Sequence, residues 1–486
     1  MQTQKRCWNC RDRKTACDRS RPTCRKCRER KETCLGYGIK LSWPRENDRR
    51  RFTRAKGHCL FPVQSGDLEF VNTSSEDIEV SQQLSRLHHS PKSYEMMWLS
   101  QLPRMTMGRA DCTLTPPNGV TPVARLISSS YDADDLYGLL LRLSINDDEK
   151  PTLATRHAIS ALSYQHLDKD KALVYQTNAV CALQSSIEAL VPSRAIQTMA
   201  ASMLLSIFET LNFDSSSLGW SIFFCGTKTI ARLVTQLHGT HYGDEALILD
   251  WIFYHDAMYK FSIRHWIKKD DDQTQLAGLT KVISKAIFAP ERQTVVPILG
   301  CSLELLDLVC QAVDAVFDRD DPRHLSKAHI ETIRSLEIRT RNAEQRHTSV
   351  SETALLELSY AANIAELYRL ATLVYLCRVG RGAPHDSQGV QELVKESFTL
   401  LDRIKFCERP WPLFVIALEA RTEESRQTVL TVLEESLRRR PLGSVYLTSR
   451  MIRDAWVQQD LRDGDIDPLI LYNLVVSRNR VPPSFA

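Results

Sequence analysis

Helical periodicity dominates the chain from about residue 126 onward. Apolar residues recur there every three or four positions, which is the period of an α-helix with one buried face. Proline and glycine mostly fall between these stretches, where helices end. The pattern predicts helices over residues 135–145, 155–167, 168–190, 195–211, 220–237, 244–266, 275–288, 302–317, 325–345, 351–379, 388–404, 422–438 and 444–461.

One of these stretches differs from the others. Residues 195–211 are apolar on nearly all sides, which predicts a central, buried helix. No strand-like alternation of useful length occurs in this region, and no fixed internal period indicates a regular solenoid. The pattern therefore predicts one large all-α body, or two packed helical halves with a seam near residues 320–350.

The N-terminus follows another pattern, set by cysteine rather than by hydrophobic period. Two copies of the spacing C-x2-C-x6-C occur between residues 7 and 34. A Cys-x2-Cys pair can place two thiolates on one zinc ion, at Zn–S distances of about 2.3 Å. The third cysteine of each half follows the second by seven residues, about two helical turns, so a helix would bring it to the same face. The candidate ligands are Cys7, Cys10, Cys17, Cys24, Cys27 and Cys34.

Counting ligand positions favours one shared site. A closed structural zinc site takes four ligands, and each half offers three thiolates. One compact site with two Zn²⁺ ions has eight positions, which six sulfurs fill if two of them bridge both ions. Because the halves repeat, the first cysteine of each, Cys7 and Cys24, is the natural bridge. A disulfide framework is the weaker reading, because it requires an oxidising compartment and no signal peptide is visible.

Charge is distributed unevenly. The net charge is +4, but residues 1–56 contain 19 Lys and Arg against 6 Asp and Glu, a net of +13. The remaining residues contain 44 against 53, a net of −9. A basic block whose charges interleave with metal ligands, on an acidic body, predicts a polyanionic partner for one end of the chain.

The cysteine segment resembles a known family. C-W-N-C-R-D-R-K-T-A-C-D, R-P-T-C-R-K-C and C-L-G-Y-G look like the binuclear zinc-cluster DNA-binding domain of fungal transcription factors. The resemblance implies two zinc ions bridged by Cys7 and Cys24, with Arg13 and Lys14 facing DNA bases in the major groove. Members of the family commonly read CGG-type triplets. Many carry a lysine before the third cysteine, where this chain has Ala16.

Further basic residues are expected to contact DNA phosphates. These are Arg11, Arg25, Lys26 and the basic run within residues 45–56, which could also serve as a nuclear import signal. The protein is therefore expected in the nucleus, with double-stranded DNA as a partner and no membrane. Residues 57–125 hold fewer heptads than the three or four that predict a coiled coil, so a homodimer is allowed but not supported by the linker.

The helical region also resembles a family element, the regulatory region that accompanies many fungal zinc clusters. The resemblance implies a regulatory, effector-responsive region rather than an enzymatic activity, so transcription machinery, co-regulators and a small-molecule effector are the partners to consider. The matching positions, in order, are residues 157–162, Trp220, residues 254–256, residues 366–370, residues 375–376, residues 421–426 and Trp456.

The resulting prediction has three parts: a zinc-cluster domain over residues 1–40, a basic then irregular linker over 41–125, and an all-α regulatory domain over 126–486. It describes a sequence-specific regulator of RNA polymerase II genes that is not an enzyme. The alternative is an all-α catalytic or scaffold protein with an accessory zinc module, and RNA binding is a third reading. Catalysis would draw on residues 270–272, on the acidic turn at 318–321, or on His255, Asp256 and His265. These read better as solvated turns and satisfied helix histidines.

Overall fold

The computed structural model describes thirteen stretches of the chain. They are residues 7–20, 23–34, 133–165, 167–211, 219–237, 243–266, 292–296, 298–347, 355–407, 409–439, 443–462, 464–479 and 481–486. The predicted helix over 275–288, the aspartates at 270–272, the basic run within 45–56 and the linker residues 57–125 lie outside them. The chain separates into two compact units, Met1–Phe70 and Val71–Ala486.

The N-terminal unit is built from two short helices, α1 (Trp8–Asp12) and α2 (Arg25–Glu29). Its core consists of cysteine: Cys7, Cys10, Cys24 and Cys27 are buried, and Cys17 and Cys34 pack against them. Within residues 7–20 and 23–34 no apolar side chain other than cysteine is buried, and burial of these cysteines alone cannot hold so small a fold. The fold of this unit therefore depends on what the sulfurs bind.

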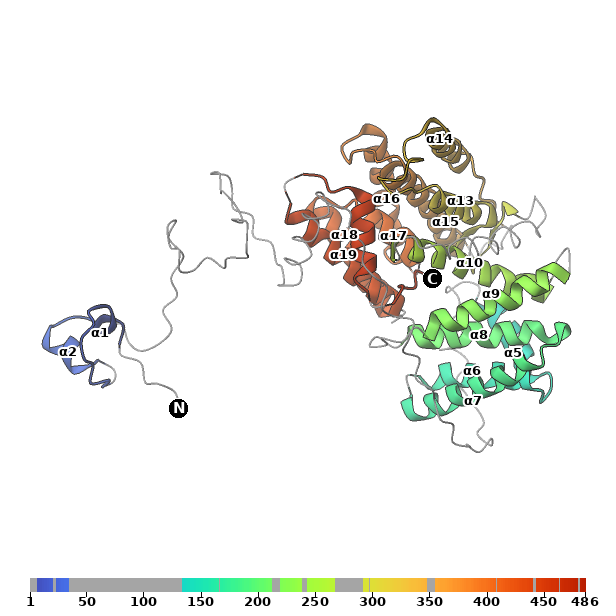
Figure 1. Cartoon of the computed structure of the whole chain (residues 1–486), viewed down its shortest axis with the longest axis horizontal. Coiled ribbons are helices and arrows are strands. Elements are labelled where there is room, and N and C mark those ends of the chain that lie inside the picture. Colours follow the sequence, from blue (N-terminus) through green and yellow to red (C-terminus); the bar gives the residue numbers. More distant parts are fainter. Residues whose placement is uncertain are drawn as a thin grey trace. The chain divides into compact units, whose positions relative to one another are not determined.

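The described part of the second unit begins with a layer of helices that lie side by side (Figure 1). Of these, α8 is buried along nearly its whole length, which confirms the prediction of a central helix over residues 195–211. The short 3-10 helix η1 (Pro192–Arg194), which begins with a proline, separates α7 from α8. The layer consists of α5 (Ala133–Ile145), α6 (Lys150–Tyr164), α7 (Lys169–Glu188), α8 (Ala195–Thr210) and α9 (Gly219–Leu237).

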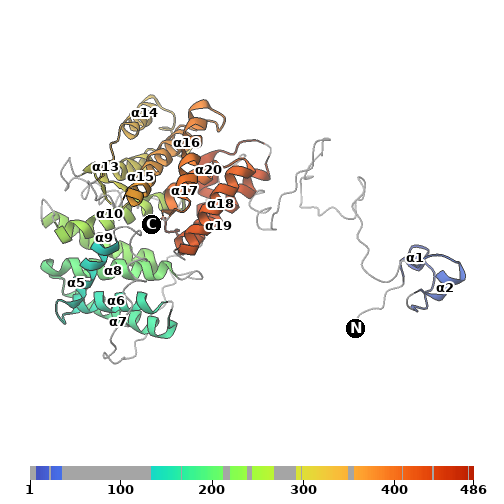
Figure 2. The ribbon, with the colours of Figure 1, turned by 180° about the vertical axis from the view of Figure 1, so that it is seen from behind.

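Helix α10 (Gly243–Trp266) joins this layer to the rest of the unit. It packs against α8 and α9 on one side and against α13 and α20 on the other (Figure 2). The second group starts with a two-stranded antiparallel sheet, β1 (Val295–Val296) and β2 (Cys301–Ser302). It continues with α13 (Leu303–Asp314), α14 (Lys327–Arg341), α15 (Leu355–Tyr375), α16 (Gln388–Ile404), α17 (Pro410–Ala417), α18 (Glu423–Arg439), α19 (Gly443–Asp460) and α20 (Pro468–Ser477).

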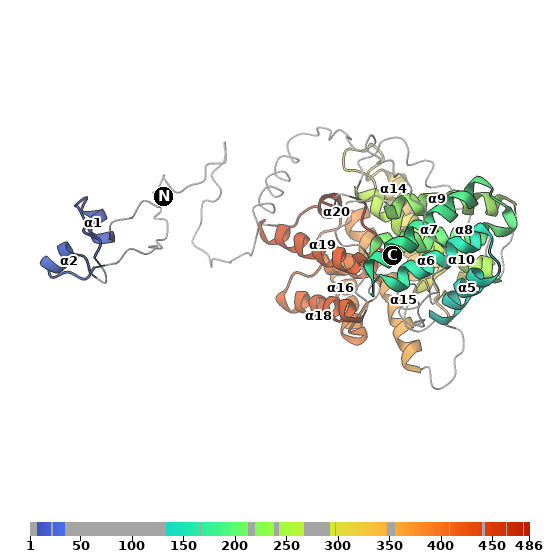
Figure 3. The same ribbon diagram turned by 90° about the horizontal axis from the view of Figure 1, so that it is seen from below.

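Helices of the second group pack both against their neighbours in the sequence and against helices farther along the chain. Helix α15 packs against α13, α14, α16 and α17, and α18 lies beside α19 (Figure 3). Because α14 packs on both α13 and α15, this helix lies inside the group rather than at a seam between two halves. The wider turn of a π-helix, η3 (Leu376–Gly380), continues α15.

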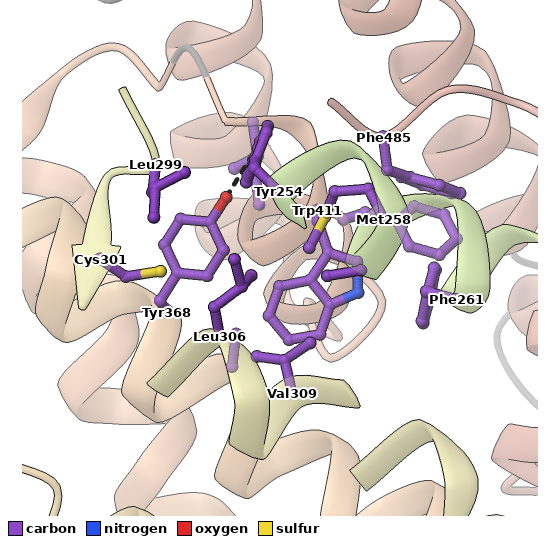
Figure 4. Packing of buried hydrophobic residues seen from close by; sticks show 14 of the residues in the cluster. Tyr254, Met258, Phe261, Leu299, Cys301, Leu306, Val309, Tyr368, Trp411 and Phe485 are labelled. Carbon is purple, nitrogen blue, oxygen red and sulfur yellow. Dashed lines mark hydrogen bonds between the residues drawn. The ribbon is translucent and has the colours of Figure 1, made fainter. Parts of the chain in front are cut away.

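Aromatic side chains fill the centre where α10, α15, α17 and α20 meet. Trp411 stacks on Tyr368, whose hydroxyl donates to the hydroxyl of Tyr254 over 3.1 Å (Figure 4). The ring of Phe261 lies 5.0 Å from that of Phe485, which brings the C-terminal segment into the core. Such edge-to-face packing adds to the stabilisation from burial.

One glycine is required by a close approach between distant helices. Gly443, at the start of α19, lies so near the carbonyl of Thr210 that a Cβ would stand 2.0 Å from its oxygen. Any side chain at residue 443 would push the end of α8 away from α19. Within the described ranges, no helix is both long and apolar enough to span a membrane.

Most predicted helices are confirmed to within a few residues, and the 388–404 helix matches at both ends. Both predicted ends of the helix over 155–167 lie too far toward the C-terminus. Helix α6 begins at Lys150, with Pro151 in its first turn, and ends at Tyr164. Two helices, α17 and α20, and the short β1–β2 pair were missed. The acidic residues 318–321 form the turn that precedes α14, as expected.

Candidate metal centre and nucleic-acid interface

Two groups of four sulfurs can each hold a metal ion. One group is Cys7, Cys10, Cys17 and Cys24, and the other is Cys7, Cys24, Cys27 and Cys34. Within each group every Sγ lies within 4.8 Å of the others. The structure thus brings all six predicted cysteines together, and Cys7 and Cys24 belong to both groups.

The sulfur spacing fits tetrahedral zinc. A tetrahedron with Zn–S bonds of about 2.3 Å has S···S edges of about 3.8 Å. The Sγ atom of Cys24 lies 3.6 Å from that of Cys7 and 3.7 Å from that of Cys10, and Cys7 lies 3.9 Å from Cys27. A disulfide would need about 2.05 Å, and none joins the described cysteines.

The two halves of the centre repeat the same local structure seventeen residues apart. The N–H of Cys10 donates to the sulfur of Cys7, and that of Cys27 to the sulfur of Cys24, both over 3.4 Å. After each helix, one lysine takes a left-handed conformation, Lys14 with φ 55° and Lys31 with φ 56°. This turn sends the chain back toward the sulfurs.

The expected route of the third cysteine was wrong. A continuous helix from Cys10 to Cys17 was predicted from the seven-residue spacing, but α1 ends at Asp12. The left-handed turn at Lys14 and the irregular residues after it return Cys17 to the cluster instead. Cys34 returns in the same way after α2. The spacing is set by a helix, a turn and a return, not by two helical turns.

Burial makes these thiols dependent on a cation. It raises the pKa of Cys7 well above the ordinary value, that of Cys24 to about 12, and that of Cys27 as well. Without a positive charge beside them, the sulfurs are protonated at neutral pH. A bound Zn²⁺ stabilises the thiolates and releases these protons.

The left-handed lysines give a stability prediction. A non-glycine residue at φ near +55° costs about 1 kcal/mol, which glycine avoids. Lys31→Gly is therefore expected to stabilise the zinc-loaded N-terminal unit by about 1 kcal/mol. Thermal unfolding at fixed free zinc measures this. Lys26→Gly, the same replacement inside α2, is the matched control and is expected to destabilise by about 1 kcal/mol. A fall in stability for both variants would contradict the prediction.

The candidate DNA contacts that the structure describes lie on α1, in the turn after it and on α2. Lys14 and Lys26 are exposed, while Arg25 pairs with Glu29 over 3.0 Å within α2. Arg11 lies on α1, but the structure does not describe its side chain. Arg13 forms an ion pair with Glu32 of the other half, an interaction that the spacing of the cysteines did not signal. The hydrogen bond to Glu32 raises the pKa of the Arg13 guanidinium.

The residues considered for catalysis that the structure describes do not form a catalytic site. Asp256 is buried and pairs with Lys228. The ring nitrogens of His265 hydrogen-bond Asn473 and Tyr375, each over 2.8 Å, and His255 packs among aromatic rings. Burial lowers the pKa of both histidines to about 3, so both are neutral. In the described part of the chain, groups of three or more metal-ligating side chains occur only at the cysteines.

Comparisons with known proteins agree with the geometry. The fungal Zn(2)-Cys(6) binuclear cluster domain matches residues 5–44, and the fungal specific transcription factor domain matches residues 120–477. The transcription factor iacI of Pestalotiopsis fici is 26% identical over 367 residues, which cover 73% of this chain and 90% of that protein. The acriflavine sensitivity control protein acr-2 of Neurospora crassa is 51% identical over 39 residues, 8% of this chain and 7% of that one.

No solved structure matches the chain significantly. The family matches describe a regulator of transcription that binds DNA and zinc, not an enzyme. The sulfur tetrads and the large helical unit are the two parts that such a protein requires. The chain therefore belongs to the fungal specific transcription factors that carry an N-terminal zinc cluster.

Proposed function

We propose that this chain regulates RNA polymerase II genes in the nucleus by reading CGG-like triplets in the major groove of DNA. Two Zn²⁺ ions, bridged by the thiolates of Cys7 and Cys24, hold the reading element in shape. The arrangement of the sulfurs carries this proposal, because two tetrads that share two members need six sulfurs, the number that the cysteines between residues 7 and 34 supply. Both ions are structural, since every coordination position is filled by protein.

Recognition is divided between two kinds of contact. Arg13 and Lys14 lie in the turn after α1 and are proposed to contact base edges, where a bidentate arginine distinguishes guanine. Arg11, Arg25, Lys26 and the basic run within residues 45–56 are proposed to contact phosphates. Phosphate contacts position the protein and make binding sensitive to salt, whereas base contacts specify the sequence.

The helical unit is proposed to receive the regulatory signal. The iacI protein shares it over most of its length and is itself a transcription factor, which supports a shared role for this unit. The described histidines considered for catalysis, His255 and His265, are buried and neutral, so they give no support to an enzymatic role of this unit. Co-regulators or a small-molecule effector are the proposed partners.

Selection of duplexes from random DNA with the full-length protein tests the proposal. We expect enriched sites that contain CGG-like triplets, and the number and spacing of triplets will report whether the protein binds as a monomer or a dimer. Matched duplexes with the triplet scrambled, at the same salt concentration, are the control. Equal affinity for selected and scrambled duplexes would exclude sequence-specific recognition. Fluorescent fusions with and without residues 45–56 test nuclear import by the basic run.

A further inference from the structure

One acidic side chain breaks the repeat within the cluster. The two halves carry Arg-Lys pairs at equivalent positions, Arg13-Lys14 and Arg30-Lys31, and both lysines are left-handed. The next residue differs: it is Thr15 in the first half and Glu32 in the second. The carboxylate of Glu32 forms an ion pair with Arg13, which belongs to the other half of the cluster.

The backbone on both sides of this ion pair is held in place. The N–H of Glu32 donates to the carbonyl of Cys27 over 3.0 Å, and the side chain of Asn9 donates to the carbonyl of Thr33 over 3.2 Å. The N–H of Arg13 donates to the carbonyl of Asn9, also over 3.2 Å. The positions of the carboxylate and the guanidinium therefore follow from the sulfur-held scaffold.

We propose that Glu32 is a positioning residue for DNA recognition: it fixes the guanidinium of Arg13, so that Arg13 meets the base edge already oriented. The inference rests on the proposed function. A guanidinium has five N–H donors, so one carboxylate leaves others for the O6 and N7 acceptors of guanine. Arginine also loses considerable side-chain freedom on binding, and orientation before binding reduces that cost. Both side chains stay 37–39% exposed, so the pair remains accessible to DNA.

The structure supplies a matched control. Glu29 also pairs with an arginine that is a proposed DNA contact, Arg25, but within one helix and at a more exposed position. Glu32→Gln and Glu29→Gln each remove one negative charge from the same small unit. Both are expected to strengthen binding to any DNA to a similar degree, because each reduces repulsion from phosphates. Only Glu32→Gln should change sequence discrimination.

The experiment compares full-length wild type and variants on a selected duplex and on its scrambled control at fixed salt. The quantity measured is the specificity ratio, the Kd for the scrambled duplex divided by the Kd for the selected duplex. We expect Glu32→Gln to reduce this ratio about tenfold, as for the loss of one oriented bidentate contact, and Glu29→Gln to leave it within about twofold. Glu32→Asp, which keeps the charge, is expected to restore part of the ratio. In an Arg13→Ala background, Glu32→Gln is expected to have no further effect on the ratio. Zinc content should be equal in all variants.

Other outcomes overturn the inference. A ratio that rises in Glu32→Gln would show that Glu32 competes with DNA for Arg13. An equal fall in both variants, or a fall that persists without Arg13, would show a general charge or structural effect. If the wild-type protein itself prefers no duplex, the proposed function fails and this inference fails with it, and that result is visible before any variant is measured.

Discussion

Replacing Cys24 with serine is expected to remove zinc from the whole cluster and to abolish specific DNA binding. The sulfur of Cys24 belongs to both tetrads, so its loss leaves each with three sulfurs. Structural zinc supplies on the order of 10 kcal/mol or more to the folding of such small units, and the buried apolar side chains among residues 7–20 and 23–34 are the cysteines themselves. We expect affinity for the selected duplex to fall to the non-specific level, about 10³-fold or more. Zinc analysis of the purified chain and DNA titration measure the two effects.

A cysteine of one tetrad separates bridging from simple ligation. Cys34 belongs only to the tetrad that contains Cys27, so Cys34→Ser is expected to lower the zinc content by one ion and leave the other tetrad complete. Cys181→Ser, in α7 of the helical unit, should leave zinc content and DNA binding unchanged. Excess chelator should reproduce the Cys24→Ser result with the wild-type chain. Equal zinc loss in Cys24→Ser and Cys34→Ser would contradict shared sulfurs at Cys24.

Hydrophobic period predicted the helices well where each has one buried face. The 388–404 helix shows why: Val390, Leu393 and Leu401 are buried on one side, and polar residues cover the other. Helix α17 was missed because all of its residues are buried and it contains Pro410 and Pro412, so the sequence shows no period and two apparent helix breakers. Both prolines lie in the first turn, where a missing N–H costs nothing.

At the metal centre, the sequence predicted which residues gather but not how. The cysteine count and repeat named the six sulfurs, and all six meet. The helical route from Cys10 to Cys17 was wrong, because nothing in the residue types marks Lys14 as left-handed. The Arg13–Glu32 pair could not be predicted either, since it depends on how the two halves fold onto each other.

A buried ion network joins four separate segments of the helical unit. Arg378 in the π-helix is 2% exposed, and its Nε donates to both carboxylate oxygens of Glu419 over 2.9 and 3.0 Å. Its other nitrogens donate to Asp465, and His385 contacts Glu419 over 2.8 Å. No sequence motif marks this network, because its members are brought together only by the packing of the loops around η3.

Glu419→Leu is expected to destabilise the helical unit by about 3–5 kcal/mol, because it leaves a buried guanidinium short of one partner. Urea unfolding followed by circular dichroism measures this. The double variant Arg378→Met/Glu419→Leu removes both charges and is expected to recover most of the loss, since Asp465 keeps its ion pair with Arg421 over 2.6 Å. Glu435→Gln, at an ion pair with exposed arginines, should leave the unfolding midpoint nearly unchanged.

The pH dependence of the same variant provides an independent check. Burial raises the pKa of Glu419, but the hydrogen bond from His385 and the charge of Arg378 outweigh burial and hold the pKa below its ordinary 4.5. A carboxylate with a depressed pKa stabilises the fold above its unfolded pKa, and this contribution disappears as pH falls through the folded value. The stability difference between wild type and Glu419→Leu should therefore be constant near neutral pH and shrink below about pH 4.5. A difference that stays constant down to pH 3 would mean that Glu419 stabilises the unit by packing rather than by its charge.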